Sequence, residues 1–289
     1  MRTVIVGALL AGCVGGCTNL DSGSRIDEAG HLVGARVGQQ PDWRAAWDEY
    51  PPAWTGESVL RLEEAVALAL RNNRSLRADP ERIAQADADL VQAGLLTNPM
   101  VVFMIMFPDG GGRSMLLGNG IPMQALQDLW LAPARKKVAT SELQQTILSV
   151  ADRAIVITAD AKKLYARLRY AQRAIELMRE NVQIIADSTE IIRARQAVGR
   201  TTQTAVNLSE IRGMRAKSDL RAMQAEFDAG RRELLVLMGV GAANAEWRVE
   251  PVSETQAPPA SPMEEDRLLS LASEQRLDLL AARWDVQAS

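Results

Sequence analysis

Cysteine and histidine are scarce in this 289-residue sequence, and each shortage argues against a kind of functional site. Both cysteines, Cys13 and Cys17, lie near the N-terminus, so the rest of the chain has no disulfide framework and no cysteine-based metal site. The single histidine, His31, lies in a polar, glycine-containing segment. We find no Ser/His/Asp set, no phosphate-binding glycine loop and no His/Cys cluster. The sequence therefore predicts neither an enzyme nor a protein with a metal ion or cofactor.

The charge of the chain is nearly balanced. Its 33 Lys and Arg residues against 36 Asp and Glu residues give a net charge of -3. A chain that binds nucleic acid usually carries an excess of basic residues on one surface. We therefore expect no nucleic-acid partner, and the features that point to a function must lie in the pattern of the sequence.

The N-terminus has the pattern of an export signal. One Arg precedes a short apolar run from Val4 to Ala11, which is much shorter than the roughly 20 residues of a membrane-spanning helix. The stretch that ends at Cys13 resembles a bacterial lipobox, while Cys17 leaves a more usual signal length. We predict a signal peptide over 1–16 with lipid attached to Cys17. The alternatives are lipid on Cys13, or a plain export signal in which both cysteines are incidental.

The next two segments differ in character. Residues 17–56 carry glycines and several aromatic residues, and we predict an extended leader that lays its aromatics on a larger body. Residues 57–98 show apolar residues three and four positions apart, which is typical of one face of a helix. Asn72-Asn73 ends the first helix, and Asp79-Pro80 predicts the start of a second one.

A short apolar run then occurs within residues 99–126. The run from Met100 to Phe107 is followed by a Gly-rich stretch and a second apolar segment, which favours two strands joined by a loop. An isolated pair of strands is at best marginally stable in water. The pair therefore needs strands from another copy, or lipid against one face.

A long helical hairpin is predicted over residues 133–239. A Gly-containing stretch at 199–202 interrupts the pattern and marks the tip, and Gly239 is a suitable residue to end the returning helix. Before the tip, apolar or small residues alternate in steps of four and three, as they do in a coiled coil. The residues of this seam are Leu143, Ile147, Val150, Ala154, Ile157, Ala161, Leu164, Leu168, Ala171, Ile175, Met178, Val182, Ile185, Thr189 and Ile192.

The C-terminal segment resembles the first predicted helix. After a linker at 251–262 that contains Pro and Ser, residues 263–289 match the earlier helical segment at a shift of 203 positions, with Leu271 over Leu68 and Ala272 over Ala69. We interpret residues 57–250 as a first repeat and residues 263–289 as the truncated start of a second.

Several segments together resemble one known family. They are "LRLEEAVALALRNNRSLRA" at 60–78, "ADLVQAGLLTNPMV" at 88–101, the helix that leads into "RARQAVGRTT", and "LRAMQAEFDAGRRELLVLMG" at 220–239. In this order they resemble the TolC-type outer-membrane efflux proteins, many of which are lipoproteins. Two departures are the Arg74 that follows the Asn pair in place of the usual Pro, and the missing greater part of the second repeat.

The resemblance implies a mainly α-helical fold with one β-hairpin. It implies a homotrimer in which the long antiparallel coiled-coil hairpin contributes to an α-helical barrel and the two strands contribute to a trimeric outer-membrane β-barrel. The chain would be lipid-anchored in the outer membrane, extend into the periplasm, and work with a periplasmic adaptor protein and an inner-membrane pump. The adaptor would dock on the tip of the hairpin, for which the candidate residues are Arg195, Val198, Gly199, Arg200 and Thr201.

A second interpretation of the same features remains open. A periplasmic adaptor or scaffold lipoprotein can also be an exported, lipidated chain with one long coiled-coil hairpin. Adaptors flank that hairpin with β-rich half-domains, whereas here the flanks are an apolar strand pair and a repeat of the first helix. The flanks therefore favour the channel. Drugs, metals and solvents are equally compatible with the sequence as cargo.

Overall fold

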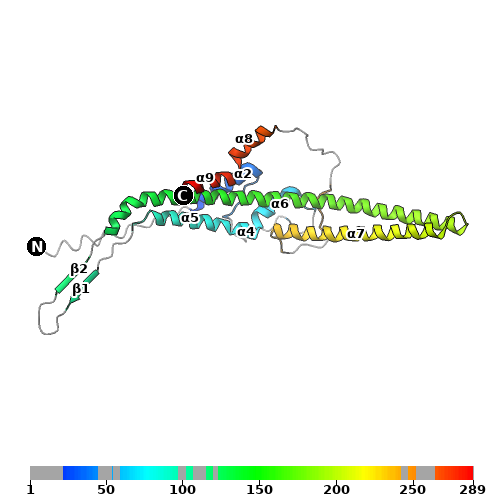
Figure 1. Cartoon of the computed structure of the whole chain (residues 1–289), viewed down its shortest axis with the longest axis horizontal. Helices are drawn as coiled ribbons and strands as arrows, with labels where there is room; N and C mark the ends of the chain where they lie inside the picture. Colours follow the sequence, from blue (N-terminus) through cyan, green and yellow to red (C-terminus); the bar gives the residue numbers. More distant parts are fainter. Residues whose placement is uncertain are drawn as a thin grey trace. The chain divides into compact units, whose positions relative to one another are not determined.

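The computed structural model describes residues 22–44, 54, 59–96, 102–106, 115–119, 123–241, 247–251 and 264–288. Its elements, shown in Figure 1, are α2 (Ser22–Val37), α3 (Leu62–Asn72), α4 (Arg74–Arg77), α5 (Asp79–Ala93), β1 (Val102–Met106), β2 (Met115–Asn119), α6 (Met123–Ala197), α7 (Gln203–Leu237), α8 (Glu265–Gln275) and α9 (Leu277–Ala288). The chain divides into two compact units. The first contains residues 79–150 and 270–289 with the N-terminal segment to Ala29, and the second contains residues 30–78 and 151–269.

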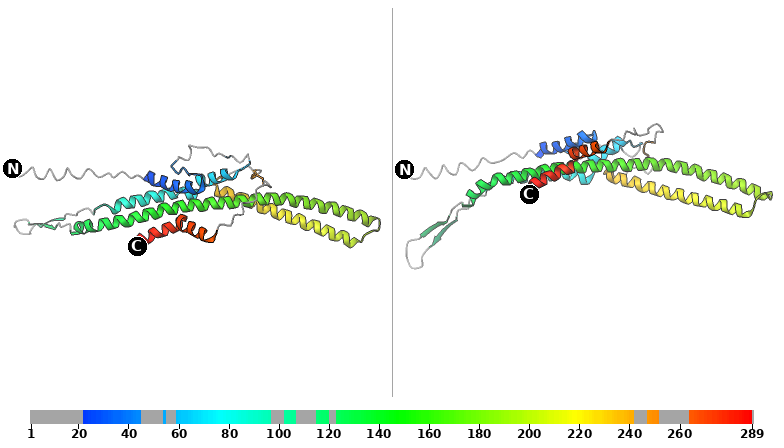
Figure 2. Two further views of the ribbon diagram at one scale, coloured as in Figure 1. Left: turned by 90° about the horizontal axis from the view of Figure 1, so that it is seen from above. Right: turned by 45° about the horizontal axis from the view of Figure 1, so that its top comes forward.

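In the first unit, α5 lies beside the N-terminal part of α6, as Figure 1 and the left view of Figure 2 show. The strands β1 and β2 form an antiparallel pair in which Val102 is opposite Asn119 and Met106 is opposite Met115. The predicted strand pair is thus present. The helix α9 contacts α6 through a hydrogen bond from Gln145 Nε2 to Asp285 Oδ1 of 3.3 Å.

In the second unit, α7 runs antiparallel along the C-terminal part of α6 and forms the predicted hairpin (Figure 1). Every residue of the predicted seam on α6 is buried or partly buried, from Leu143 to Ile192. On α7, the small seam residues Ser209, Ala216 and Gly230 are also buried. The periodicity in steps of three and four therefore identified the packed face correctly, because a coiled coil keeps one face of each helix toward its partner.

An aromatic core closes the hairpin at the end opposite the tip. Trp54 and Trp247 meet edge to face with their ring centroids 5.2 Å apart, beside the buried Tyr165 of α6. Leu60 and Val249 form a parallel β-bridge here. The Tyr165 hydroxyl donates to the Leu60 carbonyl at 2.9 Å and accepts from the backbone N–H of Glu250 at 3.3 Å. One side chain of the hairpin thereby holds two extended segments that flank it in the sequence.

The junction between α3 and α7 is held by polar contacts. Asn73 caps α4, because its Oδ1 accepts from the backbone N–H groups of Ser75 and Leu76, both at 3.1 Å. Its Nδ2 donates to the Leu237 carbonyl at 2.9 Å, near the end of α7. The chain then turns at Gly239, where φ is +66°. The predicted helix ends at the Asn pair and at Gly239 are confirmed.

Two predicted boundaries were wrong. The leader 17–56 was expected to be extended, yet α2 occupies Ser22–Val37. Its buried residues Ala29, Gly30 and Val33 form a narrow face of small side chains, which a search for larger apolar residues overlooks. The helix predicted to begin at Pro133 begins at Met123, so residues 123–126, predicted within the strand region, are helical. Pro133 lies inside α6, where it removes one backbone hydrogen bond without ending the helix.

None of the helices in the described ranges has both the length and the hydropathy needed to cross a lipid bilayer.

Candidate docking site at the tip of the helical hairpin

The helix α6 ends in a Schellman motif centred on Gly199. The Gly199 N–H donates to the Gln196 carbonyl at 2.9 Å, and the Arg200 N–H donates to the Arg195 carbonyl at 2.8 Å. This pattern requires a left-handed residue, and Gly199 has φ of +71°. An added Cβ at Gly199 would meet nothing within 4 Å. The glycine is therefore needed for the backbone conformation of the turn and not for lack of space.

The helix α7 begins with a side-chain cap. Thr202 is extended, with φ of -92° and ψ of 155°, and its hydroxyl accepts from the backbone N–H of Ala205 at 3.3 Å. One helix thus ends and the next begins within five residues, Val198 to Thr202, each with a local motif that satisfies backbone groups. The tip is a defined turn whose conformation is set by these residues themselves.

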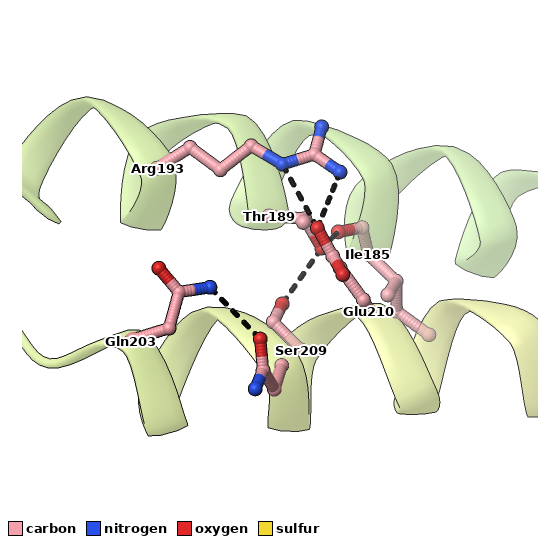
Figure 3. Close-up of polar contacts among 7 residues, drawn as sticks. Ile185, Thr189, Arg193, Gln203, Ser209 and Glu210 are labelled. Atoms are coloured by element: carbon pink, nitrogen blue, oxygen red, sulfur yellow. Dashed lines mark hydrogen bonds and ion pairs between the residues drawn. The ribbon is translucent and has the colours of Figure 1, made fainter. Parts of the chain in front are cut away.

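A pair of buried hydroxyl groups joins the two helices behind the tip (Figure 3). Thr189 Oγ1 and Ser209 Oγ are 2.7 Å apart, and Thr189 Oγ1 also donates to the Ile185 carbonyl at 2.8 Å. Because a hydroxyl has one proton, Ser209 donates to Thr189. A buried polar pair in a coiled-coil seam favours one register of the helices. The pair therefore fixes how the residues of the turn are presented.

An ion pair lies closer to the turn, on the surface. Arg193 Nη2 and Nε donate to Glu210 Oε1 at 2.7 and 3.2 Å, as Figure 3 shows. Both side chains are more than a third exposed, so the pair contributes about 0–1 kcal/mol. The sequence analysis did not find Arg193, Glu210 or Ser209 as supports of the site. The sequence does contain a signal for this ion pair, because Arg193 and Glu210 carry opposite charges and lie at similar distances before and after the turn.

The structure brings the five predicted tip residues together: Val198, Gly199, Arg200 and Thr201 lie in the turn, and Arg195 lies in the last turn of α6. Arg195, Val198, Gly199 and Arg200 are exposed, and Thr201 is partly exposed. The apolar side chain of Val198 is 69% exposed, whereas the apolar seam residues that precede it on α6 are buried or partly buried. Within the described part of the chain, the guanidinium groups of Arg195 and Arg200 have no ion-pair or hydrogen-bond partner. The tip thus offers two free cationic groups and one apolar side chain.

A second apolar stripe runs along α6, and the sequence analysis missed it. Its five residues are spaced by seven positions and are 68, 49, 65, 55 and 69% exposed; they are Tyr170, Leu177, Ile184, Ile191 and Val198. A spacing of seven places side chains on one face of a coiled-coil helix. On α7, Leu208, Ile211 and Met214 are also at least 41% exposed. The packed hairpin therefore leaves additional apolar surface uncovered.

The remaining residues considered in the sequence analysis lie away from the tip or outside the described residues. The candidate lipid-attachment residues Cys13 and Cys17 lie outside the described residues. His31 is exposed on α2. Among the residues that the structure describes, no group of three or more His, Cys, Asp or Glu side chains is placed to hold a metal ion.

Comparison with known proteins gives matches in structure alone. No protein-family model matches the sequence, and the search of curated proteins found no relative. A membrane protein from Pseudomonas aeruginosa superposes with a TM-score of 0.63 at 20% identity, over 85% of this chain and 59% of that one. The outer membrane protein VceC from Vibrio cholerae gives a TM-score of 0.59 at 20% identity, over 78% and 56% of the two chains.

The channel-forming protein CusC gives a TM-score of 0.58 at 15% identity, over 83% of this chain and 59% of its own. The chain thus spans less than three fifths of the length of each of these structures. VceC is described as an outer membrane protein and CusC as a protein that forms a transmembrane channel, which agrees with the sequence resemblance. The chain therefore shares the fold of these three solved structures over the part that is matched.

Proposed function

We propose that this protein is the outer-membrane channel component of a tripartite efflux system, a passive conduit that exports small molecules across the periplasm and the outer membrane. The fold shared with outer-membrane and channel proteins supports this proposal. The observation that carries it is the second apolar stripe on the hairpin. A conduit performs no chemistry, so its function depends on assembly.

The stripe distinguishes a barrel of hairpins from a single hairpin. A two-helix coiled coil needs one apolar seam on each helix, and α6 already buries its seam against α7. The second stripe, from Tyr170 to Val198, has side chains that are about half or more exposed. Burying them against another hairpin would contribute on the order of 1 kcal/mol per residue. A scaffold or adaptor that uses one isolated hairpin would instead leave this stripe in water.

Closure of such an assembly requires several copies. Two antiparallel strands, β1 and β2, cannot satisfy their outer edges alone, and in lipid every backbone group must be paired. A homotrimer in which each protomer has two repeats would supply enough strands for a closed β-barrel. The helices α3 and α8 each have 11 residues and are offset by 203 positions, which supports the repeat.

The N-terminus would hold the chain on the outer membrane. A lipidated Cys17, or Cys13, would carry several acyl chains, and several chains bind a bilayer firmly whereas one does so weakly. Outer-membrane lipid, the periplasmic adaptor and the inner-membrane pump are the partners of this proposal.

The adaptor would dock on the tip. Val198 offers an apolar contact, and Arg195 and Arg200 offer guanidinium groups that are free to pair with acidic side chains of a partner. Replacing Gly199 with a bulky residue should therefore weaken adaptor binding and efflux while the trimer still assembles. Gly38 provides a matched control, because it also has a positive φ, +79°, with nothing within 4 Å of an added Cβ.

Efflux in living cells tests the proposal. The full-length gene is expressed, with its cognate adaptor and pump, in a host whose own outer-membrane channel has been deleted. We expect resistance to exported compounds to return, and to fall when Gly199 but not Gly38 is replaced. Restoration of efflux by the chain in a host that lacks an adaptor but retains a channel would instead identify an adaptor.

A further inference from the structure

A cavity of about 420 Å³ lies in the second unit, between the two helices of the hairpin and the segment 247–251. Its walls include Gln172 of α6, Phe227 and Arg231 of α7, and Trp247. Cavities of roughly 300–1,000 Å³ are typical of small-molecule sites. The volume is therefore sufficient for a small organic ligand.

Two polar atoms in the walls of this cavity are buried and have no hydrogen-bond partner among the described residues. They are the Nε of Arg231, which is a donor, and the Oε1 of Gln172, which is an acceptor. A buried polar group without a partner destabilises the folded state. An unpaired donor and an unpaired acceptor in one cavity therefore indicate a ligand that supplies both partners.

The Arg231 guanidinium has a fixed position in the cavity wall. Its Cζ lies 4.8 Å from the ring centroid of Trp247 and 5.8 Å from that of Phe227. Its Nη1 lies 3.6 Å from Asp228 Oδ1, and the Arg231 side chain is only 13% exposed. The two rings and the carboxylate thus hold the guanidinium, while its Nε–H still lacks an acceptor.

The charges around the cavity favour an anion. The two carboxylates that line it, Glu176 and Asp228, are each paired with an arginine. Arg179 and Arg248 also line it, and in the part of the chain that the structure describes their guanidinium groups have no ion-pair or hydrogen-bond partner. The cavity therefore has an excess of positive charge.

We propose that this cavity binds a small oxyanion that also carries an O–H group, with the oxyanion on Arg231 and the O–H on Gln172. Arginine binds carboxylate and phosphate oxygens through paired N–H groups. The O–H donates to Gln172 Oε1, which an anion without a proton donor cannot do. Hydroxycarboxylates and hydrogen phosphate share this chemistry. The bound anion would link α6, α7 and the segment 247–251, so it should stabilise the hairpin whether or not the chain conducts.

Calorimetric titration of the full-length protein in detergent tests the proposal with two matched pairs of anions. Hydrogen phosphate has an O–H group that sulfate lacks at neutral pH, and lactate has a hydroxyl that propionate lacks. In at least one pair, we expect the anion with the O–H to bind at least about threefold more tightly, which is the effect of one hydrogen bond. The pair that shows this preference distinguishes a phosphate from a carboxylate ligand, and its O–H member should raise the melting temperature.

Variants of the cavity walls test the two contacts separately. Arg231→Gln should weaken binding at least about tenfold, because a charge-assisted hydrogen bond is lost. Arg232→Gln is the matched control, since Arg232 is an exposed neighbour on α7 outside the cavity wall, and it should change the affinity by less than about twofold. Gln172→Met replaces a partly buried side chain with one of similar size, so it should keep the fold and abolish the preference for the anion with the O–H.

Three results would overturn the inference. They are the absence of binding by all four anions, equal binding within both pairs, and an equal loss of affinity in the Arg231 and Arg232 variants. If Arg231→Gln does not fold, as far-ultraviolet circular dichroism would show, Gln172→Met decides, because an unchanged preference for the O–H in that variant would also contradict the proposed site.

Discussion

Replacing Gly239 with alanine should destabilise the protein far more than the same change at Gly199. Both glycines have a left-handed backbone, with φ of +66° and +71°, and both end a helix through a Schellman motif. A Cβ in this conformation costs about 1–2 kcal/mol at either position. At Gly199 the added atom meets nothing within 4 Å, so that cost is the whole effect.

At Gly239 the surroundings add a second cost. The Cβ would lie 2.1 Å from the carbonyl oxygen of Asn72 and 2.6 Å from its carbonyl carbon, and these backbone atoms cannot move aside by a change of rotamer. Asn73 is tied to the end of α7 by its bond to the Leu237 carbonyl, so a shift of the junction would strain that contact as well. Overpacking of this kind typically costs about 1–3 kcal/mol. We expect about 2–5 kcal/mol in total for Gly239→Ala.

Urea unfolding of the purified full-length protein in detergent, followed by far-ultraviolet circular dichroism, measures the difference. The free energy of unfolding should fall by about 1–2 kcal/mol for Gly199→Ala and by at least twice as much for Gly239→Ala. Equal losses for the two variants would refute the close contact between the end of α7 and the end of α3.

Two further predictions concern buried hydroxyl groups. Tyr165→Phe should cost about 0.5–1.5 kcal/mol of stability, because two hydrogen bonds of the buried hydroxyl are lost while the Glu250 N–H keeps its bond to the Leu60 carbonyl. Burial raises the pKa of Tyr165 above its usual value of 10.0, so the wild type should lose stability as the pH rises above about 10 and the variant should lose less; identical pH profiles in thermal melts would contradict this. Thr189→Val should cost about 1–3 kcal/mol by leaving the Ser209 hydroxyl buried without its acceptor. Adding Ser209→Ala should recover part of that loss in a double-mutant cycle, and strictly additive losses would show that the two hydroxyls are not coupled.

Local sequence signals predicted the hairpin and its tip well. A seam in steps of three and four determines which face of α6 is packed, and Gly199 and Gly239 mark turns because few other residues adopt a positive φ. The end of α3 at the Asn pair and the start of α5 at Asp79-Pro80 also followed from local signals, since Asn favours helix ends and Pro favours the first turn of a helix. In each of these cases the determinant lies within a few residues of the feature.

The remaining features depend on contacts between distant parts of the chain. Nothing in the sequence distinguishes Tyr165 from the other residues of a long helix, yet its bonds reach Leu60 and Glu250, 105 and 85 residues away. The helix α2 was missed because its packed face is made of small residues. The start of α6 was misplaced because Pro133 was taken as a helix start, whereas it lies inside a helix that begins at Met123. The second apolar stripe was not predicted because one seam is enough to explain a two-helix hairpin. Its signal in the sequence is the spacing of Tyr170, Leu177 and Ile184 by seven positions.

Single-channel recording tests the central claim most directly. Full-length protein is purified as an oligomer and added to a planar lipid bilayer, with and without its adaptor. If the protein is a passive conduit, we expect stable conductance steps of uniform size, because each inserted oligomer adds one open passage. A folded trimer that never conducts, even with the adaptor present, would contradict the proposal that this chain forms a channel.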